Sequence, residues 1–147
     1  MARKILFRGK GCGSGEWFYG DLIHKRIWGN DVVVIRTEDS GFDNYVEYEV
    51  IPETVGQCTG IPDGNNRKMY DGDICCFRIF GIDSTIVKIS YRYGTPGFEP
   101  VFPEQVHPDD RRWNSFYKDE EDDLWNPHYF RVIGNIHDNP ELLEGVQ

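Results

Sequence analysis

Residues Val50–Ile74 read V-I-P-E-T-V-G-Q-C-T-G-I-P-D-G-N-N-R-K-M-Y-D-G-D-I. The stretch begins as a strand that Pro52 ends, because proline has no amide hydrogen to donate to a sheet. A connector rich in glycine and proline follows, and Asp63–Asn66 is typical of a tight turn. Tyr70–Asp73 then introduces a new strand. The pattern predicts antiparallel strands joined by short turns, with a boundary between two lobes in the connector Pro52–Gly64.

The rest of the chain continues this alternation of strands and turns. Tyr45–Ile51 alternates apolar and polar residues, which is typical of a half-buried strand. Further strands are predicted over Lys4–Arg8, Glu16–His24, Asp31–Arg36, Ile74–Phe80, Thr85–Tyr91 and Tyr129–Ile136. Turns are predicted around Gly9–Gly15, Gly29-Asn30 and Gly81–Ser84, and a loop is predicted over Gly94–Pro103. Hairpins at this spacing predict small, curved antiparallel sheets or barrels.

Helix signals are few. Trp113, Phe116 and Tyr117 are spaced three and four residues apart, so Asp109–Lys118 is either a short helix or an acidic loop with buried aromatics. Asn139–Glu144 is expected to form one more helical turn. The predicted fold class is therefore mainly β, with little helix.

Composition indicates one acidic domain that is large enough to fold without disulfide bonds or structural metal ions. The chain has 147 residues and a net charge of −9, of which Glu104–Asp123 contributes −5, from eight acids and three bases. No apolar run approaches the roughly 20 residues that span a bilayer, so no membrane contact is expected. The four cysteines Cys12, Cys58, Cys75 and Cys76 are interpreted as buried, reduced thiols, which fit a reducing cytoplasm.

Three blocks of sequence resemble the YopX family, small proteins encoded by phages and prophages. They are Ile5–Lys10 with Trp17–Asp21, then Val50–Ile74, and finally Val132–Ile136 with Asn139–Leu143, and they occur in the family's order. The resemblance implies a mostly β protein in the cytoplasm of a bacterial host and implies no particular biochemical activity. We expect a single YopX-like domain over residues 1–147, with an N-terminal lobe over 1–55 and a C-terminal lobe over 65–147.

The resemblance also marks a set of signature residues that combine turn formers with apolar neighbours, so their expected role is structural. They are Pro52, Glu53, Thr54, Gly56, Gln57, Tyr70, Gly72, Asp73, Gly134 and Asn135. Carboxylates cluster around them at Glu53, Asp63, Asp71 and Asp73, and such a cluster is an alternative site for a divalent cation or for acid–base chemistry. The spacing of a calcium loop fails, because Arg67 replaces the fifth ligand and Ile74 the twelfth.

Other catalytic patterns are not recognisable. The alternating glycines Gly9–Gly15 match no phosphate-loop motif, and strand rather than helix follows them. His24, His107, His128 and His137 are scattered, without the short spacing of metal ligands. We therefore expect no cofactor, no metal and no enzymatic activity.

Two classes of function stay open. The first is a non-enzymatic interaction protein that self-associates and binds a host or phage protein, with the acidic run Asp119, Glu120, Glu121, Asp122 and Asp123 as candidate contact residues. The second is a nucleic-acid-binding accessory protein. It would use the aromatic and basic residues of the N-terminal lobe, which are Arg3, Arg8, Lys10, Trp17, Tyr19, Lys25, Arg26, Trp28, Tyr45 and Tyr48. A continuous basic groove would favour nucleic acid, whereas an apolar or acidic patch would favour protein.

Overall fold

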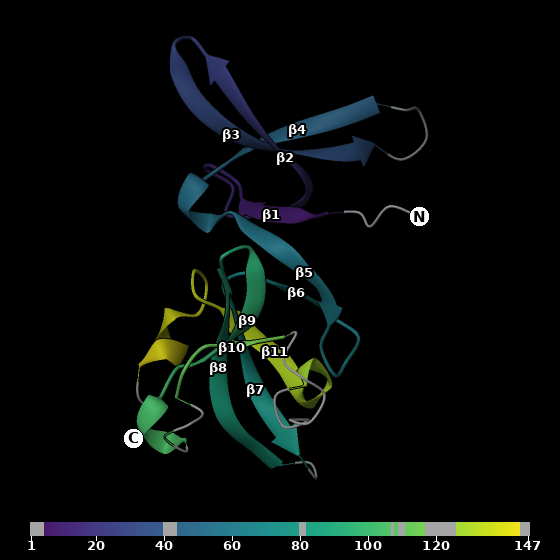
Figure 1. Ribbon diagram of the computed structural model, residues 1–147. Coiled ribbons are helices and arrows are strands. Elements are labelled where there is room, and N and C mark those ends of the chain that lie inside the picture. Colours follow the sequence, from purple (N-terminus) through teal and green to yellow (C-terminus); the bar gives the residue numbers. More distant parts are fainter. Residues whose placement is uncertain are drawn as a thin grey trace. The chain divides into compact units, whose positions relative to one another are not determined.

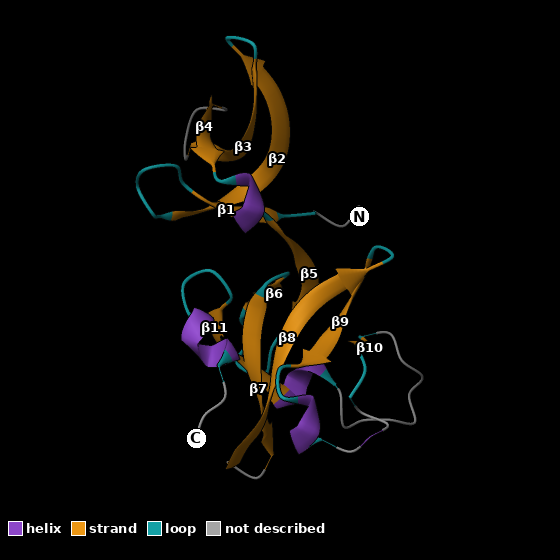
Figure 2. Cartoon of the chain, turned by 90° about the vertical axis from the view of Figure 1, so that its left-hand side faces the viewer, coloured by secondary structure: helices purple, strands orange, loops and turns teal. Residues whose placement is uncertain are grey.

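The structure is a computed structural model, and it describes residues 5–39, 44–79, 82–106, 108, 111–116 and 126–144. The chain divides into two compact units, Met1–Cys58 and Thr59–Gln147. Antiparallel strands make up most of both units, and the helical segments of the described residues are 3-10 turns (Figures 1 and 2). The predicted mainly β fold with little helix is confirmed.

One antiparallel sheet forms the N-terminal unit. Its strands are β1 (Phe7–Lys10), β2 (Trp17–Ile27), β3 (Asn30–Asp39), β4 (Asn44–Val50) and the first residues of β5 (Gly56–Pro62), in the order β4-β3-β2-β1-β5. The long β2–β3 hairpin pairs Asp21 with Arg36 at its open end and Ile27 with Asn30 at its tip. Inside the sheet, the rings of Phe18 and Tyr48 stack with centroids 3.9 Å apart.

This sheet is strongly curved, and its curvature brings β1 back to the end of β4. Gly11 forms an isolated bridge with Val50, and the Cys12 amide donates to the Glu49 carbonyl oxygen at 3.0 Å. The approach requires a glycine at position 9, because a Cβ there would lie 2.7 Å from Cγ2 of the buried Val50. The described strands leave the sheet open rather than closed as a barrel.

A second antiparallel sheet forms the C-terminal unit, in the order β10-β9-β8-β7-β11. Its strands are β7 (Asp73–Ile79), β8 (Ile82–Arg92), β9 (Thr95–Pro100), β10 (Asn114–Ser115) and β11 (Phe130–Asn135), while β6 (Lys68–Tyr70) pairs with β5. The 3-10 turns are η1 (Pro52–Thr54) in the N-terminal unit and η2 (Pro103–Gln105), η5 (Pro127–Tyr129) and η6 (Pro140–Leu143) in the C-terminal one. The last of these is the helical turn predicted over Asn139–Glu144.

Phe98 lies at the centre of the C-terminal core. Its ring stacks on Phe130 with centroids 4.1 Å apart and packs on Phe116 at 4.4 Å. The buried cluster also contains Met69, Cys75, Val87 and Ile89. Because β9 and β11 lie on opposite sides of the β7–β8 pair in the sheet order, the Phe98–Phe130 contact holds together strands that do not pair with each other.

Strand β9 corrects the prediction of a loop over Gly94–Pro103. Two prolines fit into this strand because their missing amides face away from β8. The Pro96 carbonyl accepts the Phe116 amide on the β10 side, and Pro100 lies four residues further on, so it has the same orientation. Because β10 is only two residues long, the absence of amide hydrogens at Pro96 and Pro100 costs few hydrogen bonds on that side of β9.

Two further expectations bear on connecting segments. The connector Pro52–Gly64 contains the division between the units after Cys58, and it also contains strand β5, whose Gly56 and Gln57 pair with Arg8 and Phe7 of β1. Within the range Asp109–Lys118, where the sequence left a helix and a loop open, the described residues 111–116 form no helix, because Asn114 and Ser115 pair with β9 as a short strand. The aromatic burial expected of the alternative loop does occur at Phe116, which packs against the core.

The Thr54 hydroxyl ties η1 to β1 and generates a stability prediction. Thr54 Oγ1 accepts the Lys10 amide at 2.9 Å and donates to the Ile51 carbonyl oxygen at 2.6 Å. Thr54→Val keeps the shape but leaves the Lys10 donor unsatisfied, so we expect a loss of about 1–2 kcal/mol in the free energy of unfolding. Urea denaturation measures it. Thr54→Ser, which keeps the hydroxyl, should lose clearly less, and equal losses would contradict this account.

Candidate functional site

The signature residues of the N-terminal unit surround the junction of β4, η1 and β5. Pro52 and Glu53 are exposed, whereas Thr54 and Gly56 are buried. The Val55 amide closes η1 by donating to the Pro52 carbonyl oxygen. Gln57 is half-buried and pairs with Phe7 in the ladder between β1 and β5. The junction therefore joins three strands by backbone contacts, and Glu53 is its carboxylate that faces solvent.

A second group of signature residues surrounds the β6–β7 turn. Asp73 is 1% exposed, and its Oδ2 accepts the Tyr70 amide at 2.8 Å. Gly72 has φ of 93°, a left-handed conformation that favours glycine. Its amide donates to the Ile89 carbonyl, and its own carbonyl accepts the Ile136 amide. The turn thus fastens β7 to β8 and to the end of β11.

Asp63, near the signature residues, is a buried carboxylate that accepts several backbone amides. It is 2% exposed, and its Oδ1 accepts the amides of Asn65 at 2.9 Å and Arg67 at 2.8 Å. Its Oδ2 accepts the Val132 amide on β11, also at 2.9 Å. The next residue, Gly64, donates to the Phe130 carbonyl at 2.8 Å. This turn covers the outer edge of β11, an edge that would otherwise present unpaired backbone groups.

The third signature pair, Gly134 and Asn135, shapes the turn that follows β11. Asn135 Oδ1 accepts the amides of His137 and Asp138, both at 2.9 Å. A Cβ on Gly134 would lie 2.5 Å from Oδ1 of Asn139, so the turn requires glycine there. The Asn135 side chain and the close packing at Gly134 both shape the local backbone.

The carboxylates of the signature are not grouped as a metal site. Among the residues that the structure describes, no group of three or more histidine, cysteine or acidic side chains could hold a metal ion. Asp63 and Asp73 instead direct their oxygens at backbone amides of their own unit. The described residues also contain no helix long and apolar enough to cross a membrane.

All four cysteines are free, and they differ in burial. Cys75 and Cys76 are buried in β7, Cys58 is half-buried, and Cys12 is exposed, so the expectation of a buried thiol is wrong for Cys12. Burial, followed by the nearby carboxylates of Asp73 and Asp63, raises the pKa of the Cys75 thiol well above its ordinary value. A thiol in that state is a poor nucleophile at neutral pH.

The histidines and the acidic run contribute no assembled site. His24 and His128 are exposed, His137 is half-buried, and His107 lies outside the described residues. The candidate contact residues Asp119–Asp123 also lie outside them. Trp113, which precedes the acidic run in the sequence, donates its Nε1 hydrogen to the Ser90 carbonyl oxygen at 3.3 Å.

Three basic side chains in the described part of the N-terminal unit, Lys25, Arg26 and Arg36, are paired with carboxylates. Lys25 on β2 and Arg36 on β3 both form ion pairs with Glu47 on β4, and the Arg36 Nη2–Glu47 Oε1 distance is 2.7 Å. Arg26 pairs with Asp31 across the β2–β3 hairpin, at 3.6 Å. These described residues form alternating charges rather than the continuous basic groove that the nucleic-acid hypothesis requires.

Other basic residues of this unit lie near the chain's beginning. Arg8 is only 4% exposed, and its guanidinium lies 4.8 Å from the centroid of the Trp17 ring. Lys10 is half-buried, and Arg3 lies outside the described residues. A buried guanidinium stacked on its own aromatic neighbour does not offer a phosphate contact.

Aromatic side chains remain exposed on the same unit. Tyr19 and Tyr45 are largely exposed, and Trp28 at the tip of the β2–β3 hairpin is 96% exposed. The tip residues are Trp28 and Gly29, one position before the predicted Gly29-Asn30 turn, because Asn30 already pairs with Ile27. An aromatic tip was not predicted from the sequence, although a two-residue Trp-Gly interval between strands is the signal that marks it.

Comparison with known proteins places the chain in a family. The family model described as YopX protein matches residues 6–144. No curated protein matches the chain. Among solved structures, the crystal structure of protein EF1440 from Enterococcus faecalis is similar with a TM-score of 0.45 and 22% identity, over 97% of this chain and 100% of that one.

The Asp63 bonds predict that this carboxylate is needed for stability. In Asp63→Asn one oxygen is replaced by an amide nitrogen, which cannot accept a hydrogen bond from a backbone amide. We expect a loss of about 1–3 kcal/mol in the free energy of unfolding, measured by urea denaturation. Glu53→Gln, an exposed signature carboxylate, is the control and should stay within about 0.5 kcal/mol of the parent. Equal stability of the two variants would contradict the role of Asp63.

The Glu47 ion pairs predict a dependence of stability on pH. Hydrogen bonds from Lys25 and then Arg36 hold the pKa of the Glu47 carboxyl below its ordinary value. A lowered folded-state pKa stabilises the fold above the unfolded-state pKa, and the contribution disappears as the pH falls through the folded-state pKa. The stability difference between parent and Glu47→Gln should therefore shrink in acid and in high salt. A difference that grows on acidification would contradict the assignment.

Proposed function

Because this chain belongs to the YopX family, we propose that it is a non-enzymatic interaction protein that binds a phage or host protein in the bacterial cytoplasm. The observation that carries the proposal is the surface of the N-terminal unit. Tyr19, Trp28 and Tyr45 are exposed on it, while Lys25, Arg26 and Arg36 are each paired with a carboxylate. Exposed aromatics beside paired charges suit a protein partner, whose interfaces are enriched in tyrosine, tryptophan and arginine.

The charges distinguish this proposal from nucleic-acid binding. A phosphate backbone is bound by cations that are free to release its counterions. Lys25 and Arg36 share the Glu47 carboxylate, and Arg26 faces the largely exposed Asp31. An approaching phosphate would meet these carboxylates and would have to displace them. The nucleic-acid alternative therefore needs a rearranged surface, whereas protein binding uses the surface as it stands.

Two buried carboxylates, Asp73 in the signature and Asp63 near it, support a non-enzymatic role. Asp63 and Asp73 are used within the fold, with their oxygens on the amides of Asn65, Arg67, Val132 and Tyr70. A general acid or base must instead reach a substrate atom. These are the acidic residues that motif reading would first select for chemistry, and their geometry directs them at the backbone.

The acidic run Asp119–Asp123 is proposed as a second contact with the partner. Five consecutive acids repel one another and favour solvation over packing. Opposite a basic patch on a partner they would accelerate association by electrostatic steering, an effect that salt suppresses. Carboxylates in a row would then stand in for the phosphates of a nucleic acid.

Capture from host lysate tests the proposed function. The purified chain is used as bait in lysate of infected bacteria, with and without nuclease, and each captured protein is titrated against it. We expect a specific protein that is retained after nuclease treatment, and no salt-sensitive binding of a labelled single-stranded oligonucleotide by fluorescence anisotropy. Loss of the captured protein on nuclease treatment, together with oligonucleotide binding, would favour the nucleic-acid alternative. Replacing Asp119–Asp123 by Asn and Gln should slow association without changing the melting temperature.

A further inference from the structure

Two hairpin tips in the described structure have the same unusual construction. Trp28-Gly29 joins β2 to β3 with φ of 52° and 80°, and Tyr93-Gly94 joins β8 to β9 with φ of 53° and 76°. Two central residues with positive φ define a type I′ turn, whose usual residues are Asn-Gly. In both tips a bulky aromatic residue occupies the first position, where a left-handed conformation is unfavourable.

The folded unit gains little from the tip aromatics in return. The Trp28 side chain is 96% exposed and that of Tyr93 is completely exposed, so neither ring packs on its own unit. An asparagine would relieve the backbone strain at either position. An aromatic residue that is both strained and unburied is better explained by contact with another molecule.

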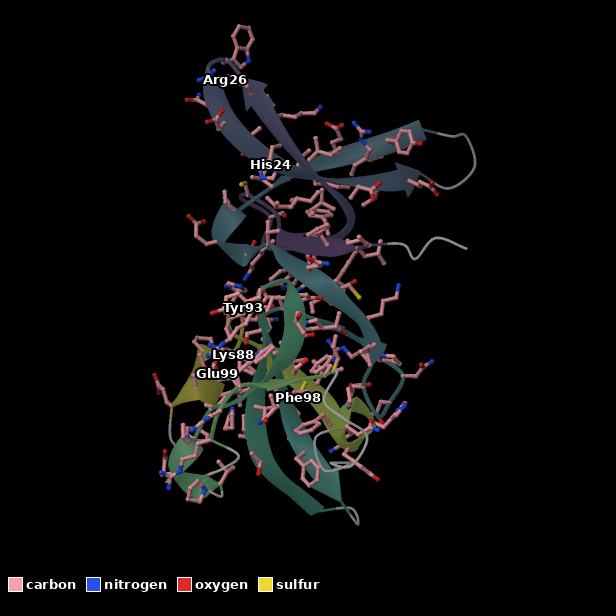
Figure 3. All side chains as sticks on the ribbon, viewed as in Figure 1. His24, Arg26, Lys88, Tyr93, Phe98 and Glu99 are labelled. Carbon is pink, nitrogen blue, oxygen red and sulfur yellow. The ribbon has the colours of Figure 1, made fainter. Side chains whose placement is uncertain are left out.

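An ion pair flanks the Trp28 tip, and Arg92, paired with Glu99 at 3.3 Å, flanks the Tyr93 tip. Arg26 and Asp31 lie opposite each other on β2 and β3 and form a largely exposed ion pair at 3.6 Å. Arg26 lies on the hairpin near its tip (Figure 3). Ile27, between Arg26 and Trp28, is also exposed. The Trp28 tip therefore presents an apolar group beside one positive and one negative side chain.

A pocket of matching chemistry lies in the C-terminal unit. Its volume is about 320 Å³, and Lys88, Glu99, Pro100, Val101, Pro103 and Leu143 line it. Lys88 and Glu99 lie side by side on β8 and β9 with their charged atoms 3.9 Å apart (Figure 3). Ligand pockets begin at about 300 Å³, so this pocket suits one large side chain rather than an extended peptide. Proline, valine and leucine side chains form its apolar lining, Lys88 and Glu99 add charged groups, and Glu99 also pairs with Arg92 at 3.3 Å.

We propose that Trp28 of one copy of the chain inserts into the Lys88–Leu143 pocket of a second copy. In this contact Arg26 faces Glu99 and Asp31 faces Lys88, so opposite charges face each other, and Arg26 shares Glu99 with the Lys88 and Arg92 of the second copy. The proline, valine and leucine side chains cover the indole ring and remove it from water. The proposal goes beyond the proposed function, because it concerns a second copy of this chain and not the host or phage protein.

Because the tip and the pocket are different surfaces of the chain, the contact between two copies is not self-complementary, and this limits the symmetry of the assembly. One contact between two copies leaves a tip on one and a pocket on the other unused. A two-fold arrangement uses both and closes as a dimer, whereas a head-to-tail arrangement closes as a ring or extends. In either case the pocket saturates with one tip per chain.

Sedimentation velocity over a range of concentrations tests the proposal with the protein alone. We expect reversible self-association of the parent that Trp28→Asn weakens by about thirtyfold, as for a buried aromatic anchor. Tyr93→Asn is the matched control, since it makes the same exchange in the other tip and should leave association unchanged. Both variants should melt at or above the parent's temperature, because asparagine suits a type I′ turn.

Charge reversal identifies the two surfaces. Arg26→Glu and Glu99→Arg should each weaken self-association, because each places like charges opposite each other. An equimolar mixture of the two variants should associate more strongly than either alone, since the altered tip of one then fits the altered pocket of the other. A monomeric parent, equal association of parent and Trp28→Asn, or a mixture no stronger than its components would each overturn the proposal. The capture of a protein partner would be unaffected by those outcomes, so the proposed function stands or falls separately.

Discussion

The C-terminal unit depends on one buried carboxylate that is hydrogen-bonded to the edge of a sheet. Asp63 caps its own turn with one oxygen and holds the Val132 amide with the other, across 69 positions of sequence. A buried charge without partners is costly, whereas one that accepts several amides is stabilised by them. The turn containing Asp63 therefore packs on β11, and β11 is held against the core through Phe130 and its ring contact with Phe98. Without the turn that contains Asp63, the outer edge of β11 would be open to pairing with other chains.

In the N-terminal unit, neutral groups rather than a carboxylate connect the ends of strands. Thr54 links η1 to β1, and Gly9 allows β1 to approach Val50 more closely than any side chain would permit. The polar signature residues of both units thus act mostly on backbone amides at points where strands end. A residue that hydrogen-bonds the backbone at the end of a strand must have a suitable polar group in one position. Few residue types meet both conditions, so a short list of such residues is recognisable in a sequence. This requirement also explains why their recognition identifies a fold more readily than an activity.

The exposed aromatic tips do not contribute to the packing of their own units. The Trp28 and Tyr93 tips hold large apolar side chains in water and in a backbone conformation that asparagine would adopt more easily. Lys25 and Arg36 share the single Glu47 carboxylate, so each of these cations already has a partner within the unit. Both tips end hairpins that belong to larger sheets, and these sheets hold the tip aromatics away from the cores. The cost in stability at the tips is small beside the cores that support them.

By itself, the sequence determined the mainly β class, the strands with clear alternation such as Tyr45–Ile51, and membership of the family through short blocks of signature residues. These properties are local, because alternation and turn chemistry act over a few neighbouring residues. Tertiary structure alone decided that Pro96 and Pro100 fit a strand, since that depends on which side of β9 carries a partner. It also decided that Lys25 and Arg36 meet at Glu47, that Asp63 reaches Val132, and that Trp28 rather than Gly29 begins the hairpin tip. Register and long-range pairing set these contacts, and the free energy that selects a register comes from the whole buried face of a sheet rather than from any one residue.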